Sequence, residues 1–294
     1  MSSSTLVAPQ PAVEAVRGRG NPYAPHMARI VGIQRMVPDN HLFTFRFLDE
    51  EITRTFAHRP GQFIMLSIPG AGEAPISISS TPTRPQVLEL CVRRTGRVTD
   101  ALYRMKINDL VGIRGPYGNG FPVHEMIGSD VIMIAGGLGM APLRSLLWYV
   151  LDKRSDFGKL TLMYGGRNPD AMLYRNELQS LVDRPDLQTL LAVDSDTTGS
   201  WKYHVGYLAD LFDHAEVDLR TSHAAVCGPP IVYQFVLKRL LDQGFSKDRI
   251  LMSLERHMKC GVGKCGHCSI GYKYTCVHGP IFTYWDAINL PELI

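Results

Sequence analysis

Four of the six cysteines in the chain fall within seventeen residues near its C-terminal end, at Cys260, Cys265, Cys268 and Cys276. The first three are spaced C-x4-C-x2-C, and seven residues separate the third from the fourth. This spacing is typical of a plant-type 2Fe–2S site, in which one loop supplies three thiolates and a fourth arrives from beyond it. Glycines between the first three cysteines would let the loop backbone approach the inorganic sulfides and adopt positive φ angles. The segment therefore predicts a 2Fe–2S cluster with these four cysteines as ligands.

Two other uses of these cysteines must be weighed. Disulfides are disfavoured because nothing indicates secretion and cysteines so close in sequence would form strained loops. Structural zinc remains an alternative, although zinc ribbons usually offer two C-x2-C pairs and this segment has one. His257 and His267 are not needed by a site with four thiolates, and we expect them to be exposed or to lie beside the ligands. Glu255 is expected on the solvated surface.

Composition limits the classes of protein that the chain can represent. Its 294 residues suffice for about two domains, and 45% hydrophobic with 20% charged residues is ordinary for a globular protein. The net charge of +3 and the lack of a dense basic run argue against nucleic acid as a partner. No apolar stretch reaches the roughly 18 residues of a membrane span. The first ten residues do not resemble a signal peptide, so we predict a cytoplasmic protein.

The first half of the chain predicts a flexible tail followed by a barrel. Residues 1–24 are rich in Ser, Ala, Pro and Gly without periodicity, which indicates a mobile tail. Short alternating segments then follow between turns, and they predict an antiparallel β-barrel over residues 25–125. The expected strands lie at 29–36, 41–48, 62–68 and 87–93.

The second half predicts a doubly wound α/β domain over residues 126–252. Residues 130–135 form a continuous apolar run, as expected of a strand that is buried on both faces. Further strands are expected at 159–164, 187–193 and 224–227, and they alternate with helices at 174–181, 206–212 and 231–243. Residues 253–294 form the remaining, cluster-binding segment.

A glycine-rich turn follows the first buried strand of this half. Gly136, Gly137 and Gly139 precede Met140, Ala141 and Pro142, where a helix is expected to begin. Such a turn lets the backbone approach a pyrophosphate, although a tight structural turn would look the same. Gly165 with Gly166, and Cys227 with Gly228 and Pro229, follow later strands and are expected at the same sheet edge. Together the three turns predict a nucleotide cleft.

Two stretches of the barrel half suggest a second nucleotide site. Residues 74–80 are one. The other is residues 96–99, followed by a helix that is expected from Asp100 with Thr99 as its cap. The start of this helix, beside Gly96 and Arg97, could hold a diphosphate, and a plain strand–turn–helix is the alternative. Residues 114–122 look like an interdomain turn.

These motifs, in this order, resemble those of the ferredoxin–NADP reductase superfamily over residues 28–294. The cysteine segment narrows the likeness to electron-transfer subunits. Residues 73–80, 227–230 and 253–268 look most like the gamma, or diaphorase, subunit of NAD(P)-linked NiFe hydrogenases of the sulfhydrogenase type. The electron-transfer subunits of anaerobic sulfite reductase and of dihydroorotate dehydrogenase are similar alternatives.

The resemblance implies three cofactors and a role for each motif. FAD would lie along Pro75, Ile76, Ser77 and Ile78, with Leu90, Cys91, Val92 and Arg93 beside its isoalloxazine and Gly96, Arg97, Val98 and Thr99 at its pyrophosphate. NAD or NADP would occupy the turn at residues 136–142, with Cys227 and Gly228 facing the nicotinamide and Cys227 as the catalytic-site residue. FAD would accept hydride from the nicotinamide and pass single electrons to the cluster. The partners would be iron–sulfur and NiFe hydrogenase subunits of a hetero-oligomer.

Two features depart from the family pattern or leave a choice open. The superfamily usually has Arg and Tyr where this chain has Ala74 and Ile76, so Arg93, Arg94 or Arg97 would have to replace the missing phosphate partner. Asp194 could accept from a ribose hydroxyl and favour NAD, whereas Arg167 could meet a 2′-phosphate and favour NADP. A zinc-stabilised nucleotide-binding regulator without redox turnover is the alternative from another class.

Overall fold

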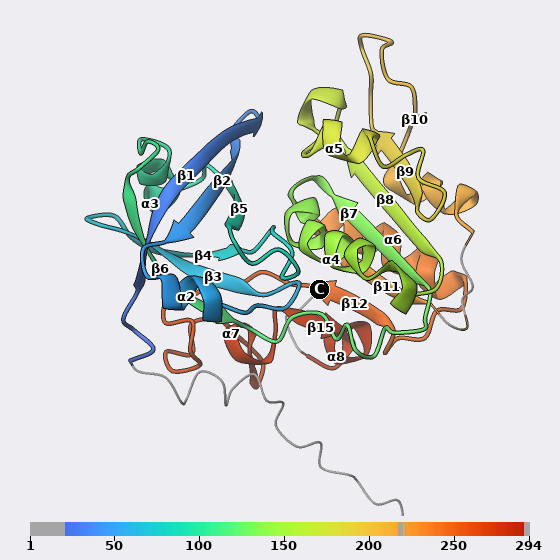
Figure 1. Ribbon diagram of the computed structural model, residues 1–294. Coiled ribbons are helices and arrows are strands. Elements are labelled where there is room, and N and C mark those ends of the chain that lie inside the picture. The colour runs from blue at the N-terminus through green and yellow to red at the C-terminus, as the bar shows by residue number, and fades with distance from the viewer. Residues whose placement is uncertain (1–20, 217–219, 221, 291–294) are drawn as a thin grey trace, which may run out of the picture.

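The computed structural model describes residues 21–216, 220 and 222–290. Two sheets lie side by side, and the orange and red C-terminal segment runs along the lower side of both (Figure 1). Of the expected flexible tail, residues 1–20 lie outside the described part of the chain. Pro22 packs against the barrel, since its carbonyl oxygen accepts hydrogen bonds from Arg114 Nη1 and the Tyr117 hydroxyl at 3.0 and 2.9 Å.

The N-terminal sheet is antiparallel, with six strands in the order β4-β3-β6-β1-β2-β5. Its apolar side chains alternate along each strand and meet in one core, which includes Phe43, Ile64 and Leu90. The sheet curls so that its two edge strands, β4 and β5, approach each other. Just beyond the end of β4, Ser79 N–H donates to Glu89 O of β5 at 2.9 Å. The expected barrel is therefore confirmed. Its strands are β1 (His26–Val37), β2 (Asn40–Phe47), β3 (Phe63–Ile68), β4 (Gly72–Ser77), β5 (Leu88–Arg93) and β6 (Leu110–Tyr117).

Two short helices accompany the barrel, α2 (Glu50–Thr55) and α3 (Arg97–Leu102). The expectation that a helix begins at Asp100 with Thr99 outside it was wrong. Thr99 is the third residue of α3, and its Oγ1 accepts from the N–H groups of Thr95 and Gly96 at 2.9 and 3.0 Å. The Thr99 hydroxyl, which lies in the first turn of α3, thus accepts from backbone amides that precede the helix. Gly96 is the residue directly before the helix.

The second sheet has seven strands in the order β10-β9-β8-β7-β11-β12-β15, and only β15 is antiparallel to its neighbour. Val131 and Met133 of β7 pack into one core with helix α4, while Ile132 and Ile134 pack into the opposite core with α6. Helices on both faces confirm the predicted doubly wound domain. Its elements are β7 (Val131–Gly136), α4 (Met140–Asp152), β8 (Leu160–Gly166), β9 (Gln188–Val193), β10 (His204–Val205), β11 (His223–Cys227), α6 (Pro230–Asp242), β12 (Ile250–Ser253) and β15 (Ile281–Thr283).

Two of the intervening helices differ from those that the sequence predicts. The helix expected at 174–181 is α5 (Arg175–Gln179), which Tyr174 precedes in the left-handed region at φ 54°. A helical segment was expected at 206–212. The structure has the 3-10 helix η4 (Leu208–His214) there, which begins two residues later than expected. Three 3-10 turns complete the domain, η1 (Gly137–Gly139), η2 (Arg154–Asp156) and η3 (Pro169–Ala171).

The C-terminal segment contacts both sheets. Strand β15 extends the parallel sheet beside β12, whereas the cysteine loop packs on the barrel. Its other elements are β13 (Ser269–Ile270), β14 (Lys273–Tyr274), α7 (Thr275–His278) and α8 (Tyr284–Ile288). No helix in the described part of the chain has both the length and the apolar character that a membrane span requires.

Candidate functional site

The three glycine turns of the α/β domain meet at one edge of the parallel sheet. Ala135 pairs in register with both Cys227 and Tyr164, and Gly136 pairs with Gly165. Gly166 pairs with Val193, the residue before Asp194. The carboxyl ends of β7, β8, β9 and β11 therefore lie level with one another, at the edge where such sheets bind nucleotides.

Gly139 is required by a close approach of two backbones. A Cβ atom at this position would lie 2.0 Å from Cys227 O and 2.8 Å from Gly228 N. At Gly137, by contrast, φ is 53° and a Cβ would meet nothing within 4 Å, so one face of the turn is open. Met140, Ala141 and Pro142 are buried in the first turn of α4 and support the turn from below. This open, side-chain-free face fits a pyrophosphate.

Cys227 lies at the end of β11 and its side chain is buried. Its Sγ is 4.0 Å from Ser253 O, which also accepts from the Tyr233 hydroxyl at 2.5 Å. Burial raises the pKa of the Cys227 thiol to about 12, and the charge of Glu255 adds to the shift. The thiol is therefore neutral at physiological pH. Glu255 is exposed, as expected.

The residues expected to choose between NAD and NADP share the same edge. Asp194 N–H donates to Gly166 O at 2.9 Å, and Ser195 N–H donates to Arg167 O at 3.1 Å. The side chains of Arg167 and Asp194 are both exposed. Both side chains are therefore available to the ribose of a bound nucleotide.

The flavin motif forms strand β4, at one edge of the barrel sheet. Pro75, Ile76 and Ser77 pair in register with Met65, Ile64 and Phe63 of β3. The following Ile78 is fully buried in the barrel core. Pro75 and Ser77, which are half-buried, are therefore better placed than Ile78 to contact a flavin with their side chains.

The second group of flavin residues alternates along β5. Leu90 and Val92 point into the barrel core, so only their backbone is available to a cofactor. Cys91 points the other way, into the core that is shared with the α/β domain, and Arg93 is exposed. Of the predicted residues on this strand, Cys91 and Arg93 are thus the ones whose side chains face away from the barrel core.

The predicted diphosphate seat at residues 96–99 has an open face. A Cβ on Gly96 would meet nothing within 4 Å. Arg97 Nη2 donates to Gly70 O at 2.9 Å, and Arg94 Nε donates to Asp100 Oδ1 at 2.7 Å. The guanidinium of Arg93 forms no hydrogen bond or ion pair with the residues that the structure describes. Among the three candidates to replace the missing phosphate partner, Arg93 is therefore the one with its guanidinium free.

The four cysteines of the C-terminal segment come together as two pairs. The thiols of Cys260 and Cys265 lie within hydrogen-bonding reach of each other, and so do those of Cys268 and Cys276. Among the described residues, no three His, Cys, Asp or Glu side chains converge tightly enough to hold a single metal ion. Two pairs of thiolates match two irons that each take two protein ligands.

Backbone amides around the loop point at the sulfurs. The N–H groups of Val262 and Lys264 donate to Cys260 Sγ at 3.4 Å, and Gly263 N–H donates to Cys276 Sγ at 3.2 Å. Burial raises the pKa of Cys260, but the amide groups more than offset it and the pKa falls to about 7. Amide donors stabilise thiolates, which is the ionisation state that a metal ligand requires.

The sequence did not reveal what holds the cysteine segment on the barrel. Arg114 was expected in an interdomain turn, but it lies in β6, with its side chain 2% exposed. Its guanidinium donates to both carboxylate oxygens of Glu73 at 2.8 and 2.6 Å and to Cys260 O at 3.2 Å. Asn119 Nδ2 donates to Ile281 O at 2.6 Å. A Gly-Pro-Tyr-Gly-Asn sequence signals a turn, but only the fold shows what that turn binds.

Comparisons with known proteins agree with this architecture. Residues 28–121 match the model of the oxidoreductase FAD-binding domain, and residues 133–238 match that of the oxidoreductase NAD-binding domain. Residues 255–287 match the iron-sulfur cluster binding domain of dihydroorotate dehydrogenase B. A solved structure of an NADH-dependent reduced ferredoxin-NADP oxidoreductase shares the fold, with a TM-score of 0.70 and 23% identity over 87% of this chain and 88% of that chain.

Several relatives extend over most of the chain. The gamma subunit of sulfhydrogenase 2 of Pyrococcus furiosus is 45% identical over 289 residues, which covers 93% of this chain and all of the relative. A probable dihydroorotate dehydrogenase B (NAD(+)) electron transfer subunit of the same organism is 33% identical over 230 residues, or 78% of this chain and 81% of the relative.

The fold, the site and these matches define an oxidoreductase of the ferredoxin–NADP reductase type with an added iron–sulfur segment. Its cofactors are FAD, NAD(P) and an iron–sulfur cluster, as predicted. The chain belongs to the family of electron-transfer subunits that includes the sulfhydrogenase gamma subunits.

Proposed function

We propose that this protein carries electrons between NAD(P)H and the iron–sulfur and NiFe subunits of a hetero-oligomeric hydrogenase. The proposal follows the 45% identity to the gamma subunit of sulfhydrogenase 2, against 33% to the dihydroorotate dehydrogenase B relative. Bound FAD supplies the exchange between two-electron and one-electron transfer, and the protein supplies position and electrostatics.

One observation carries this electron path. Met65 of β3 pairs in register with Pro75 of the flavin motif, and its side chain belongs to the same packed group as Cys268 and Cys276. The flavin motif thus lies on β4, and the cluster cysteines pack against a side chain of the adjacent strand β3, about 5 Å away in the same sheet. Such proximity supports direct electron transfer between the two sites.

The residue roles form part of the proposal. Gly136, Gly137 and Gly139 would hold the dinucleotide, with Cys227 and Gly228 beside the nicotinamide. Pro75, Ser77, Cys91 and the Gly96–Thr99 turn would hold FAD, with Arg93 as the substitute for the phosphate partner that Ala74 lacks. The cluster would be of the 2Fe–2S type, with Cys260 and Cys265 on one iron and Cys268 and Cys276 on the other.

The division of the chain and its location are also proposed. We place the FAD-binding barrel at residues 25–125, the NAD(P)-binding domain at 126–252 and the cluster segment at 253–294. The six cysteines are free thiols in the structure, which supports a reducing compartment such as the cytoplasm.

Hydrogen-dependent reduction of NAD+ and NADP+ by the affinity-purified native complex tests the proposed function. Nickel in the complex together with reduction of either nucleotide by hydrogen is the expected result. The ratio of the two rates would also settle the nucleotide preference. A complex that contains no nickel and does not respond to hydrogen would refute the hydrogenase assignment.

A second partner class is supported by one specific observation. The match of residues 255–287 to the cluster domain of dihydroorotate dehydrogenase B allows a dehydrogenase partner. Copurification of an FMN enzyme and reduction by dihydroorotate would favour this alternative, whereas a sirohaem partner would indicate a sulfite reductase.

A further inference from the structure

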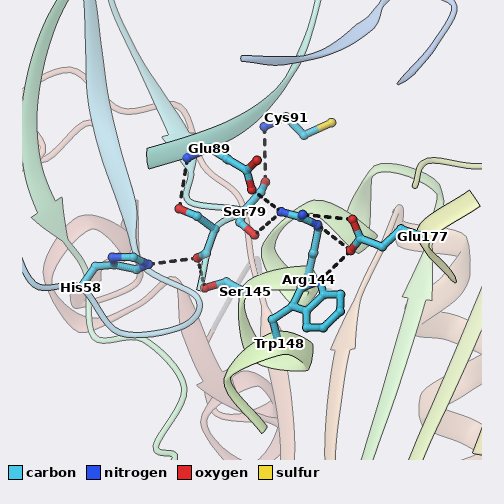
Figure 2. A network of polar contacts seen from close by, with 9 residues as sticks. His58, Ser79, Glu89, Cys91, Arg144, Ser145, Trp148 and Glu177 are labelled. Atoms are coloured by element: carbon cyan, nitrogen blue, oxygen red, sulfur yellow. Dashed lines mark hydrogen bonds and ion pairs between the residues drawn. The ribbon is translucent and has the colours of Figure 1, made fainter. Parts of the chain in front are cut away.

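Arg144 lies at the junction of the two domains, where its charge is shared between them. It follows Met140, the first residue of α4, by one turn, and its side chain is 11% exposed. Its Nη1 donates to Glu89 Oε2 at 2.7 Å and to Ser79 O at 3.1 Å, both in the barrel domain. Its Nε and Nη2 donate to the two carboxylate oxygens of Glu177 at 2.8 and 3.0 Å (Figure 2). One guanidinium thus binds both domains.

The barrel side of this junction is connected to the flavin motif. Ser79 is two residues beyond Ser77, and its Oγ accepts from Cys91 N–H at 3.3 Å. Glu89 N–H donates to Ser80 Oγ at 3.1 Å, so the segment is tied to β5 at a second point. A shift of Ser79 or Glu89 would therefore move both strands that are proposed to hold the flavin.

The α/β side is connected to the nicotinamide edge. Helix α4 begins directly after Gly139, whose backbone touches that of Cys227 so closely that no side chain could fit between them. Tilting or sliding α4 must consequently move the glycine turn and the end of β11. The contact between Arg144 and Glu177 stays within the α/β domain, so the bonds to Glu89 and Ser79 are the ones that act on the relation between the domains.

Other contacts along α4 repeat the same connection. Ser145 Oγ donates to Ser80 O at 2.7 Å, and Asp152, at the end of the helix, pairs with Arg84 Nη2 at 2.5 Å. The Arg84 guanidinium also lies over the Trp148 ring, 4.5 Å from its centroid. Because these contacts remain when one bond is removed, a change at Glu89 should leave the two domains assembled.

We propose that Arg144, through Glu89 and Ser79, is a positioning residue that sets the approach of the nicotinamide to the flavin. The inference rests on the proposed binding of the two cofactors on either side of this junction. The step concerned is NAD(P)H + H⁺ + FAD → NAD(P)⁺ + FADH2, in which hydride leaves the nicotinamide and a proton comes from solvent. Such transfers depend steeply on geometry, and a displacement of about 1 Å can cost on the order of 100-fold in rate.

The test compares Glu89→Gln, which keeps the shape but removes the charge across the junction, with Asp186→Asn. The control variant removes a carboxylate that binds Arg184 in two places, 2.9 and 2.7 Å, inside one domain. Anaerobic stopped-flow reduction of the bound flavin by NADH and NADPH yields a limiting rate and a dissociation constant. Glu89→Gln should lower the limiting rate about tenfold and change the dissociation constant less than twofold, while the control should match the wild type.

A second measurement does not depend on turnover. Hydrogen–deuterium exchange of the cofactor-free protein should speed up at the amides of Glu89 and Cys91 in Glu89→Gln, but not in the cysteine loop. Ser145→Ala, which removes an uncharged hydrogen bond across the junction, should lower the limiting rate of flavin reduction two- to threefold. Limiting rates that are unchanged in both junction variants would overturn the proposal. A dissociation constant for the nucleotide that rises by the same factor as the limiting rate falls would also overturn it. If NAD(P)H does not reduce the wild-type flavin, the proposed function itself fails, whatever the variants do.

Discussion

Met65 and Pro75 lie opposite each other in the β3–β4 pair, so the flavin motif and the support of the cysteine loop share one piece of sheet. Tyr117 of β6 and Phe63 of β3 complete that support under Cys268 and Cys276. A cluster segment that was simply appended to the α/β domain would not need these barrel residues. The support of the cysteine loop is therefore built into the barrel itself.

The first prediction concerns the cluster ligands. Cys268→Ala should abolish the paramagnetic signal of the dithionite-reduced cluster and most of the bound iron, because a buried thiolate is lost from one pair. Flavin absorption should persist, since Cys268 lies in the C-terminal segment. Electron paramagnetic resonance and iron analysis provide the measurement. Cys91→Ala is the matched control, because Cys91 is also buried but lies in β5. Retention of full iron content in Cys268→Ala would rule out the proposed ligand set.

The second prediction concerns the seat of the FAD diphosphate. Gly96→Ala should leave the free energy of unfolding of the cofactor-free protein within about 1 kcal/mol of the wild type, because the new Cβ meets no atom within 4 Å and φ is −171°. The same Cβ would occupy the open face of the turn and raise the dissociation constant of FAD about tenfold. Flavin titration measures this effect. Thr95→Ala, at the exposed neighbouring position, should bind FAD as the wild type does. Equal affinity in the two variants would place the diphosphate elsewhere.

The third prediction concerns the attachment of the cysteine loop. Arg114→Ala should lower the free energy of unfolding by about 2 kcal/mol, because it leaves Glu73 and Cys260 O without a buried charged donor. The loop should also lose iron faster to a chelator. Urea unfolding and the rate of iron release provide the measurements. Arg29→Ala removes only an exposed bond to Asn108 O and should change neither quantity. Stability and iron release like those of Arg29→Ala would refute the role of Arg114.

The fourth prediction concerns the dependence of stability on pH. Burial lowers the pKa of His58 below its ordinary value of 6.5, although the hydrogen bond to Ser80 O raises it in part. The unfolded chain therefore binds a proton at a higher pH than the folded protein does. The stabilisation is complete above about pH 6.5 and is lost as pH falls from there through the lower pKa of the folded state.

Urea unfolding of the cofactor-free protein at pH 7.5 and 5.5 tests this expectation. His58→Gln should reduce the difference in stability between the two pH values. It should not remove the difference, because burial also lowers the pKa of His41 and His223. His124→Gln, whose side chain is 71% exposed, serves as the control. A difference in His58→Gln as large as in the wild type would contradict the assignment.

The sequence by itself determined the two domains, their order and the cysteine set. Period-two alternation marks strands with one buried face, and a continuous apolar run such as that of β7 marks a strand with two. The spacing of Cys260, Cys265 and Cys268 is a local property of one loop, so it could be recognised without the fold. The short helices were less well predicted, because over five to seven residues tertiary contacts outweigh helical periodicity.

Only the tertiary structure decided which distant residues share a site. Arg144 and Glu89 are 55 positions apart, and Arg114 and Cys260 are 146 positions apart. No periodicity in the sequence relates such residues, since their contact depends on how two domains and a C-terminal segment pack together. The same packing also distinguishes the three arginines. The guanidinium of Arg93 is free among the described residues, whereas those of Arg94 and Arg97 have protein partners. The chemistry was thus set by local spacing, and its geometry by long-range packing.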